Sequence, residues 1–378
     1  MRVLLASVSV PSHLLPMVPL ADALRAAGHE VLLACQPDLV PHAESAGLLT
    51  AVVGSEQLEA DRRQRMARVA KQQAPGGTWQ PTWEQLAERW RQRVAGVVDD
   101  YVEVGRWWRP DLIVADPLEF TARVLAGVLR VPVVVHRWGP ETMSTDAVGP
   151  ARAALADICA RLGLPDGLPA PAAILDPCPP GLQFPAAAPS TAVRHVSFNG
   201  TGSVPDWARG QDRVCVSLGS MPAQLGGLAL LETLARAELG GVELLVPLAE
   251  GLHKEVGDLP SSVRVVEPTP LNLFLDGCSA VVHHGGSGTA LTALAHGLPQ
   301  LVLPQFNPAL AMCGERVAAV GAGVNLVAED QLDPAGVGEA LRVVLHEPGP
   351  RAGAGRMRDA MAEQPTPAEL LPTLEALL

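Results

Sequence analysis

The sequence predicts an α/β protein with two doubly wound halves, each built on a parallel sheet. Short apolar runs rich in β-branched residues alternate with longer segments of helical periodicity, which is the pattern of repeated strand–helix–strand units. The alternation stops in a proline-rich stretch at 164–189 and restarts after residue 212, which indicates two domains. The 378 residues, 48% of them hydrophobic, can fill two cores. Two such halves face each other across a cleft at the carboxyl ends of their strands, where this architecture binds ligands.

Strand–helix–strand units make up the first half of the chain. Its strands are expected as continuous apolar runs, buried on both faces of a sheet, at Arg2–Val10, Val31–Cys35, Thr50–Val53, Asp111–Asp116 and Val131–His136. Its helices carry apolar residues at helical spacing, at 20–27, Thr82–Trp108 and Leu118–Leu129. A loop with Ser12, His13 and Pro16 follows the first strand, and Gly28 stops the first helix. The stretch 164–189 is expected to be irregular chain that ends the first domain.

The second half repeats this alternation without repeating the sequence. Its strands are expected at Arg213–Leu218, Val242–Val246, Val263–Val266, Ser279–His283 and Gln300–Leu303. Its helices are expected at Leu228–Ala237, Ser287–His296, Pro308–Val320, Pro334–His346 and Pro367–Leu378. We therefore expect an N-terminal domain at 1–196, a glycine-rich linker at 197–212, a C-terminal domain at 213–360, and a C-terminal helix at 361–378 that can pack back on the N-terminal domain.

Composition and charge exclude several classes of protein. The net charge of −12 argues against a nucleic-acid surface and means that local donors must hold any anionic ligand. Six scattered cysteines without CxxC spacing indicate the reduced thiols of a cytoplasmic protein, not a disulfide framework or a zinc site. The apolar N-terminus lacks the basic segment and cleavage site of a signal peptide, and no segment reads as a membrane span.

The stretch 281–289, Val-Val-His-His-Gly-Gly-Ser-Gly-Thr, carries the sharpest functional signal. A buried strand ends at two histidines, and a glycine-rich turn leads directly into a helix. Glycines permit close backbone approach, and the unpaired N–H groups and the dipole at a helix start attract anions. Ser287 and Thr289 add hydroxyl donors, and His283 can donate a hydrogen bond, so the turn suits a diphosphate. The alternative is an ordinary glycine-rich turn with a histidine satisfied inside the domain.

Motifs along nearly the whole chain resemble family 1 glycosyltransferases of the GT-B fold, in which two Rossmann-like domains face each other across a cleft. The C-terminal signature is HHGGSGTALTALAHGLPQLVLPQ at His283–Gln305, followed by RVAAVGAG at Arg316–Gly323. The N-terminal half is similar through SHLLP at Ser12–Pro16, LADALRAAGHEV at Leu20–Val31 and DLIVADPLEFTARVLAG at Asp111–Gly127. The resemblance is strongest to bacterial enzymes that glycosylate polyketide and macrolide antibiotics.

The resemblance implies that His13 is the general base, which takes the proton of an acceptor hydroxyl as that hydroxyl attacks the anomeric carbon. It also implies that Asp116 holds the histidine in the correct tautomer. Apart from the resemblance, His13 can simply cap the first helix, and Asp116, which precedes Pro117, can be an N-cap.

The same resemblance implies a donor site on the C-terminal domain. The residues expected to contact the diphosphate are Ser220, His283, Gly286, Ser287, Gly288 and Thr289. Thr269 falls where the family holds the nucleotide base, but the aromatic residue that relatives often place near Pro268 is missing. The alternative for Ser220 is an ordinary turn at the end of a strand.

The donor sugar is expected to lack some hydroxyl groups. Many relatives carry an Asp-Gln pair that hydrogen-bonds the sugar, but an ungapped count back from Arg316 places Ala309 and Leu310 there. Gln305 or Asn307 can substitute for the pair. Because unpaired hydroxyls are unfavourable in a buried site, we expect a thymidine-diphosphate (TDP) deoxysugar, with a UDP-sugar as the other donor.

The acceptor site is expected on the N-terminal domain, at Ser12, Trp138 and Met143. Trp138 and Met143 follow a strand end, and flat aromatic side chains suit a hydrophobic polyketide or macrolide acceptor. Tryptophans at helical spacing are expected in the core instead, and these are Trp83, Trp90 and Trp107.

These expectations combine into an inverting glycosyltransferase whose only co-substrate is a nucleotide sugar. No DxD motif is present to hold a divalent ion, and Asp99–Asp100 lies inside a predicted helix, so no metal is expected. The alternatives are attack by an aromatic ring carbon to give a C-glycoside, a two-domain sugar-nucleotide epimerase, and a non-catalytic binder of nucleotide sugars. An epimerase needs further acids and bases that the sequence does not show, and His13 with Asp116 argues against the binder. A homodimer is left open.

Overall fold

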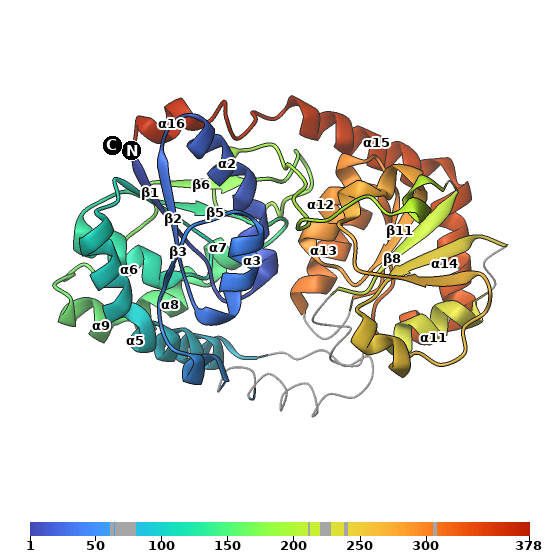
Figure 1. Ribbon diagram of the computed structural model, residues 1–378, viewed down its shortest axis with the longest axis horizontal. Helices are drawn as coiled ribbons and strands as arrows, with labels where there is room; N and C mark the ends of the chain where they lie inside the picture. The colour runs from blue at the N-terminus through green and yellow to red at the C-terminus, as the bar shows by residue number, and fades with distance from the viewer. Residues whose placement is uncertain (61–63, 65–80, 211, 220–227, 238–240, 305–307) are drawn as a thin grey trace.

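Two parallel sheets organise the molecule, and helices cover each of them. The computed structural model describes residues 1–60, 64, 81–210, 212–219, 228–237, 241–304 and 308–378. In this part of the chain one sheet has seven strands and the other six, and all their pairings are parallel. Figure 1 shows the two sheets in separate lobes, one from blue to green and the other from yellow to red. The predicted α/β class with two doubly wound sheets is confirmed.

The N-terminal sheet has the strand order β3-β2-β1-β4-β5-β6-β7. Its strands are β1 (Arg2–Ala6), β2 (Glu30–Cys35), β3 (Thr50–Val52), β4 (Leu112–Ala115), β5 (Val133–His136), β6 (Ala173–Asp176) and β7 (Thr191–Ala192). The order reverses at β1, which pairs with β2 on one side and with β4 on the other. Open α/β sheets bind ligands outside the carboxyl ends of their strands at such a switch point. The segments that follow β1, β2 and β4 therefore lie at the expected ligand edge.

Helices pack on both faces of this sheet. They are α1 (Pro11–Leu14), α2 (Val18–Ala26), α3 (Val40–Ser45), α5 (Trp83–Trp108), α6 (Phe120–Leu129), α7 (Met143–Asp146), α8 (Val148–Ala154) and α9 (Ala156–Arg161). Strand residues such as Leu5 pack on α2 and α3 in one core, and their neighbours such as Leu4 pack on α5 and α6 around Tyr101 in another. Successive side chains of a strand point to opposite faces, so each apolar run fills both cores.

The C-terminal sheet has the strand order β10-β9-β8-β11-β12-β13. Its strands are β8 (Arg213–Ser217), β9 (Glu243–Pro247), β10 (Val263–Val266), β11 (Cys278–His283), β12 (Gln300–Val302) and β13 (Gly323–Asn325). Its helices are α11 (Leu228–Arg236), α12 (Ser287–Ala295), α13 (Pro308–Ala319), α14 (Pro334–His346) and α15 (Pro348–Glu363). The order reverses at β8, which pairs with β9 and β11, so the turn from β11 into α12 lies at this sheet's ligand edge.

The end of the chain returns to the N-terminal lobe. In Figure 1 the red segment after α15 crosses to that lobe and ends beside the N-terminus. Leu370, Leu371 and Leu374, in or next to α16 (Leu371–Glu375), are buried in the same core as β1 and α2. Their burial fastens the last residues to the N-terminal sheet.

Local expectations near the N-terminus and in the core are partly wrong. The first strand ends at Ala6, not Val10, and the segment with His13 is the short helix α1, not a loop. Pro11 occupies the first position of α1, where its fixed φ and missing N–H favour a helix start. Of the three tryptophans expected in the core, Trp90 is buried, but Trp83 and Trp107 are 40% and 69% exposed.

Several regular elements were not expected from the periodicity, and they are β6, β7, β13, α1, α3, α7, α8, α9 and α15. Strand β6 lies inside the stretch expected to be irregular. It has only four residues, with prolines on either side, which is too short to show the alternation of a strand. Helix α15 was not expected because glycine, proline and arginine dilute its apolar pattern. The final helix is also shorter than the expected Pro367–Leu378, since α16 has five residues.

Candidate active site

His13 and Asp116 meet at the carboxyl edge of the N-terminal sheet. His13 lies in α1, which follows β1, and Asp116 directly follows β4, the neighbouring strand. The Nδ1 atom of His13 lies 3.3 Å from Oδ1 of Asp116, and the imidazole keeps 16% exposure while the carboxylate is fully buried. With Nδ1 engaged by the carboxylate, Nε2 is the ring nitrogen available to a substrate.

Asp116 is surrounded by donors that keep it ionised. Burial alone would raise its pKa, but the hydrogen bond and charge of His13, with the backbone N–H groups of Val8 and Leu118, hold the pKa below its usual value. These two N–H groups donate to the carboxylate at 2.6 and 2.8 Å. Because the pKa of Asp116 is lowered in the folded state, the ionised carboxylate stabilises the folded protein. This contribution is fully present above about pH 4 and is lost only as the pH falls further. The carboxylate is therefore charged at neutral pH and accepts the Nδ1 proton of His13.

The indole of Trp138 covers one face of the His13 ring. Trp138 lies in the loop after β5, and the two ring centroids are 4.0 Å apart with an interplanar angle of 33°. Such a contact restricts the rotation of the imidazole, and an aromatic face also stabilises a nearby positive charge. Trp138 is expected in the acceptor site; the structure places it on the candidate base.

The next residue in the same loop, Gly139, touches the C-terminal lobe. A Cβ atom added to Gly139 would lie 2.6 Å from the Cβ of Ser287 and 3.4 Å from Cδ1 of Leu291. Real Cβ atoms do not approach each other that closely, so the absence of a side chain allows this contact. Ser287 is the first residue of α12. Two neighbouring residues of one loop therefore contact the candidate base and the start of α12, Trp138 the former and Gly139 the latter.

The turn between β11 and α12 has the geometry of an anion site. Gly285 adopts a φ of +94°, and a Cβ atom there would collide with the carbonyl of Leu310 near the start of α13, so this position requires glycine. A Cβ atom at Gly288 would meet nothing within 4 Å, so the first turn of α12 borders open space. The N–H groups of that turn have no carbonyl inside the helix to bond, and they belong to Ser287, Gly288 and Thr289.

His283 points into the domain, which differs from its expected contact with the diphosphate. Its side chain is fully buried, with Nε2 2.8 Å from Oε1 of Gln300. Its Nδ1 accepts the N–H of Gly285 at 3.1 Å. Burial lowers the pKa of His283 to about 3, so the ring is neutral. Both ring nitrogens are engaged within the domain, and neither is free to donate to a phosphate.

His284 is the histidine that borders the glycine-rich turn. A Cβ atom added to Gly219 or Gly286 would lie 2.5 or 2.6 Å from the His284 ring, so both glycines pack directly on it. Its Nδ1 lies 3.2 Å from the carbonyl of Ser217 and donates to it. The segment after β8 and the turn after β11 are therefore joined through this imidazole.

A completely buried arginine holds the loop after β5 in place. The guanidinium of Arg137 pairs with Glu141 at 3.1 Å and with Asp176 at 2.7 Å. It also donates to the hydroxyl of Ser144 and to the carbonyl of Ala188, each at 2.9 Å. Arg137 is not among the residues expected from the sequence. The sequence feature that could have indicated it is a charged residue directly after an apolar strand, with a carboxylate four positions later.

Known proteins share this organisation along the whole chain. Residues 22–219 match the N-terminal domain, and residues 230–377 the C-terminal domain, of the family described as erythromycin biosynthesis protein CIII-like. The L-demethylnoviosyl transferase of Streptomyces niveus is 35% identical and is matched over 100% of this chain and 98% of its own. The chain belongs to this family of glycosyltransferases.

Other members of the family support the same assignment. The 10-deoxymethynolide desosaminyltransferase of Streptomyces venezuelae is 32% identical over 100% of this chain and 97% of its own. Among solved structures, the spinosyn rhamnosyltransferase SpnG is 37% identical with a TM-score of 0.87, covering 100% of both chains. SpnG has also been solved with thymidine diphosphate and with the spinosyn aglycone, at TM-scores of 0.87 and 0.86. The GT-B fold is confirmed for this glycosyltransferase.

The other expected site residues of this glycosyltransferase are more dispersed. Ser12 is exposed in α1, next to His13. Met143 begins α7 and packs, half-buried, against the cluster that contains Trp90. The hydroxyl of Thr269, after β10, donates to the carbonyl two residues earlier at 3.1 Å. Three expected donor residues lie outside the described part of the chain, namely Ser220, Gln305 and Asn307.

The described residues hold neither a metal-binding cluster nor a membrane-spanning helix. These residues contain no cluster of three or more His, Cys, Asp or Glu side chains suited to a metal ion. Among the helices in this part of the chain, none is both long and apolar enough to cross a bilayer. All six cysteines are free and buried.

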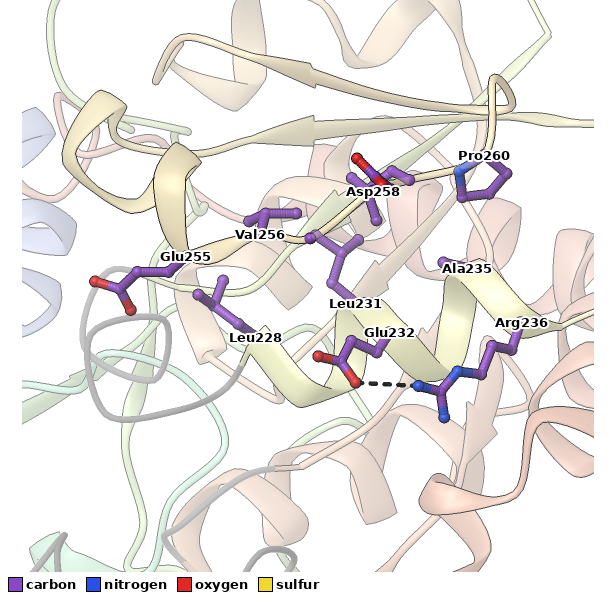
Figure 2. Close-up of a pocket in the computed structure, with 11 residues that line it drawn as sticks. Leu228, Leu231, Glu232, Ala235, Arg236, Glu255, Val256, Asp258 and Pro260 are labelled. Atoms are coloured by element: carbon purple, nitrogen blue, oxygen red, sulfur yellow. Dashed lines mark hydrogen bonds and ion pairs between the residues drawn. The ribbon is translucent and has the colours of Figure 1, made fainter.

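A hollow on the C-terminal lobe lies apart from these groups. It has a volume of about 300 Å³ and opens between α11 and residues 255–260. Figure 2 shows the Glu232–Arg236 ion pair, 3.4 Å long, on the α11 side of this hollow. None of the residues of the base or of the glycine-rich turn contributes to its lining, so we assign it no part in sugar transfer.

Proposed function

We propose that this chain transfers a deoxysugar from a TDP-sugar to a hydrophobic polyketide or macrolide acceptor, with inversion at the anomeric carbon. The loop after β5 supports this most directly, because Trp138 packs on His13 while Gly139 packs on Ser287. The proposed proton acceptor and the proposed anion-binding start of α12 are therefore both in contact with this loop. The relatives agree in chemistry, since one is named a 10-deoxymethynolide desosaminyltransferase and SpnG has been solved with thymidine diphosphate and with an aglycone.

In the proposed reaction, the acceptor hydroxyl gives its proton to Nε2 of His13 while its oxygen bonds to the anomeric carbon. The bond from that carbon to the diphosphate oxygen breaks on the opposite face, and TDP leaves with the electron pair. The sugar passes through an oxocarbenium-like state. Asp116 holds the Nδ1 proton and stabilises the imidazolium, as in other base-plus-carboxylate pairs. The first turn of α12 stabilises the charge that grows on the departing diphosphate.

The start of α13 supports a donor sugar with few hydroxyl groups. Helix α13 begins at Pro308, so Ala309 and Leu310 lie in its first turn. The carbonyl of Leu310 borders Gly285 in the glycine-rich turn, which puts the apolar residue Leu310 beside the proposed diphosphate position. Apolar side chains cannot pair with sugar hydroxyls, and each buried unpaired hydroxyl costs about 1–3 kcal/mol.

The chain should therefore use TDP-rhamnose at least roughly tenfold more efficiently than TDP-glucose, as measured by kcat/KM. Initial rates with 10-deoxymethynolide and with the spinosyn aglycone, and mass spectra of the products, measure this ratio. The variant Leu310→Gln offers an amide to the extra hydroxyl of glucose. It should reduce the ratio of kcat/KM for TDP-rhamnose to kcat/KM for TDP-glucose. A higher rate with TDP-glucose would contradict the donor class, and no transfer from any TDP-sugar would contradict the proposed function itself.

Transfer should not depend on a divalent ion, because the α12 start supplies the positive end of a helix dipole to the leaving diphosphate. Full activity is expected after dialysis against EDTA and in assays that contain EDTA. A loss of activity that Mg²⁺ or Mn²⁺ restores would show that an ion shares in stabilising the leaving group.

We also propose a cytoplasmic location. The six free, buried thiols suit a reducing compartment. Nucleotide-sugar donors would reach the enzyme there without crossing a membrane.

A further inference from the structure

Two buried polar side chains at the ligand edge of the N-terminal sheet have no hydrogen-bonding partner. Gln36 directly follows β2, is 2% exposed, and lacks a partner at both Oε1 and Nε2. Ser9, which follows β1, is 8% exposed, and its Oγ is also unpartnered. Buried polar groups are almost always paired, and each unpaired one costs about 1–3 kcal/mol. A buried amide with neither end paired is therefore unfavourable for the fold.

Gln36 follows β2, on the side of β1 away from Asp116, and Ser9 lies on the segment that leads from β1 to His13. Strands β2 and β4 flank β1, and the register aligns all three strands at Ala6, so the segments after them leave at one edge. Neighbouring strands are about 4.8 Å apart, so Gln36 starts about one strand spacing from the segment that leads to His13. A molecule the size of a macrolide can contact the base and this region at the same time.

A surface hollow opens next to Gln36. Its volume is about 480 Å³, and it lies between the segments after β2 and β3, with Pro37, Val52 and Gly54 in its lining. A Cβ atom added to Gly54 would lie 3.9 Å from Cγ of Gln36. The side chains of Val97 and Leu58 lie 3.0 and 3.8 Å from the same Cβ position, so Gln36 packs with them behind the backbone of Gly54. The carboxylate of Asp100 accepts the N–H of Gly54 at 2.7 Å and holds that backbone in place.

We propose that Gln36 and Ser9 form a polar subsite that binds a neutral oxygen group of the acceptor, a carbonyl or a hydroxyl. The proposal rests on the proposed function, because it assigns a specificity role to the acceptor side of that site. A carboxamide offers both N–H donors and a carbonyl acceptor, and a hydroxyl can donate and accept. Lactone carbonyls, ketones and hydroxyls of a polyketide acceptor match this set. When one of these oxygen groups binds to Gln36 and Ser9, another hydroxyl of the acceptor is oriented toward Nε2 of His13.

The substitution Gln36→Leu removes the unpaired atoms at nearly constant volume. Without ligand, the variant should be more stable than the wild type, with Tm raised by roughly 2–4 °C, because the unfavourable buried amide is gone. The acceptor KM should rise about tenfold, the amount expected for one lost hydrogen bond in a site built for it. The kcat should change less, since Gln36 touches no reacting atom.

A matched control is Gln300→Leu in the C-terminal lobe. Gln300 is also fully buried, but its Oε1 pairs with His283 at 2.8 Å and its Nε2 donates to the carbonyl of Ala290 at 3.2 Å. Leucine there leaves partners unpaired, so Tm should fall. The two glutamine variants should therefore shift Tm in opposite directions.

The test combines thermal unfolding without ligand and steady-state kinetics, with TDP-rhamnose as donor and 10-deoxymethynolide and the spinosyn aglycone as acceptors. A raised Tm together with a raised acceptor KM supports the subsite. A lowered Tm for Gln36→Leu overturns it, because the amide would then be serving the fold. A raised Tm with an unchanged KM for every acceptor used also overturns it. A wild-type chain that transfers no sugar contradicts the proposed function and the subsite with it, whereas the other outcomes leave the function standing.

Discussion

Replacing His13 by alanine should lower kcat/KM for sugar transfer by roughly 10²- to 10⁴-fold, the usual contribution of a positioned general base. The acceptor hydroxyl would have to lose its proton to water, while the donor would still bind at the start of α12. The affinity for TDP should therefore stay close to that of the wild type. Steady-state kinetics and titration calorimetry with TDP measure the two effects separately.

The controls for this prediction distinguish the base from a merely structural histidine. His42→Ala removes an exposed histidine of α3 and should leave both quantities unchanged. Asp116→Asn keeps the size of the side chain but removes the charge that holds the Nδ1 proton, and it should lower kcat by up to roughly 10⁴-fold. A His13→Ala enzyme with nearly full turnover would show that the base is elsewhere or that the chain only binds its ligands.

Replacing Arg137 by methionine should have the largest effect on stability. Methionine fills much of the same space but leaves the carboxylates of Glu141 and Asp176 buried without their partner. Removing one partner of a buried ion pair costs about 3–5 kcal/mol in the free energy of unfolding. The loop that carries Trp138 and Gly139 loses its anchor as well, so activity should fall even below the melting temperature. Chemical denaturation followed by circular dichroism measures the change in stability.

The matched control is Arg161→Met. Arg161 pairs with Asp99 at 2.9 Å, but both side chains are at least half exposed. Exposed ion pairs contribute about 0–1 kcal/mol, so this variant should unfold almost like the wild type. If Arg137→Met is no more destabilising than Arg161→Met, the buried network does not fix the loop after β5.

Much of the fold could be predicted because the strands are buried on both faces. Parallel strands of this kind read as apolar runs between helical segments, and most of the expected strands and helices exist within a few residues of their predicted bounds. Strand β6 and helix α15 could not be predicted in this way. Four residues between prolines show no period, and the arginines and glycines of α15 mask its buried side, which faces the C-terminal core through Ala354 and Met361.

The site could be predicted in outline but not in detail. The resemblance to family 1 glycosyltransferases predicted the contact between His13 and Asp116, and the structure shows it. Sequence could not decide which of the adjacent histidines His283 and His284 is buried, because that depends on which face each ring takes at the end of β11. The contact of Gly139 with α12 joins residues far apart in the sequence, and no local pattern encodes the distance between two lobes.

The most direct test of the whole account is a crystal structure of this chain with TDP. We predict the diphosphate within hydrogen-bonding distance of the N–H groups of Ser287, Gly288 and Thr289, with its terminal phosphate facing the His13 ring across Gly139. A diphosphate bound elsewhere would contradict the account. So would a complex in which the lobes separate and the imidazole lies far from the terminal phosphate.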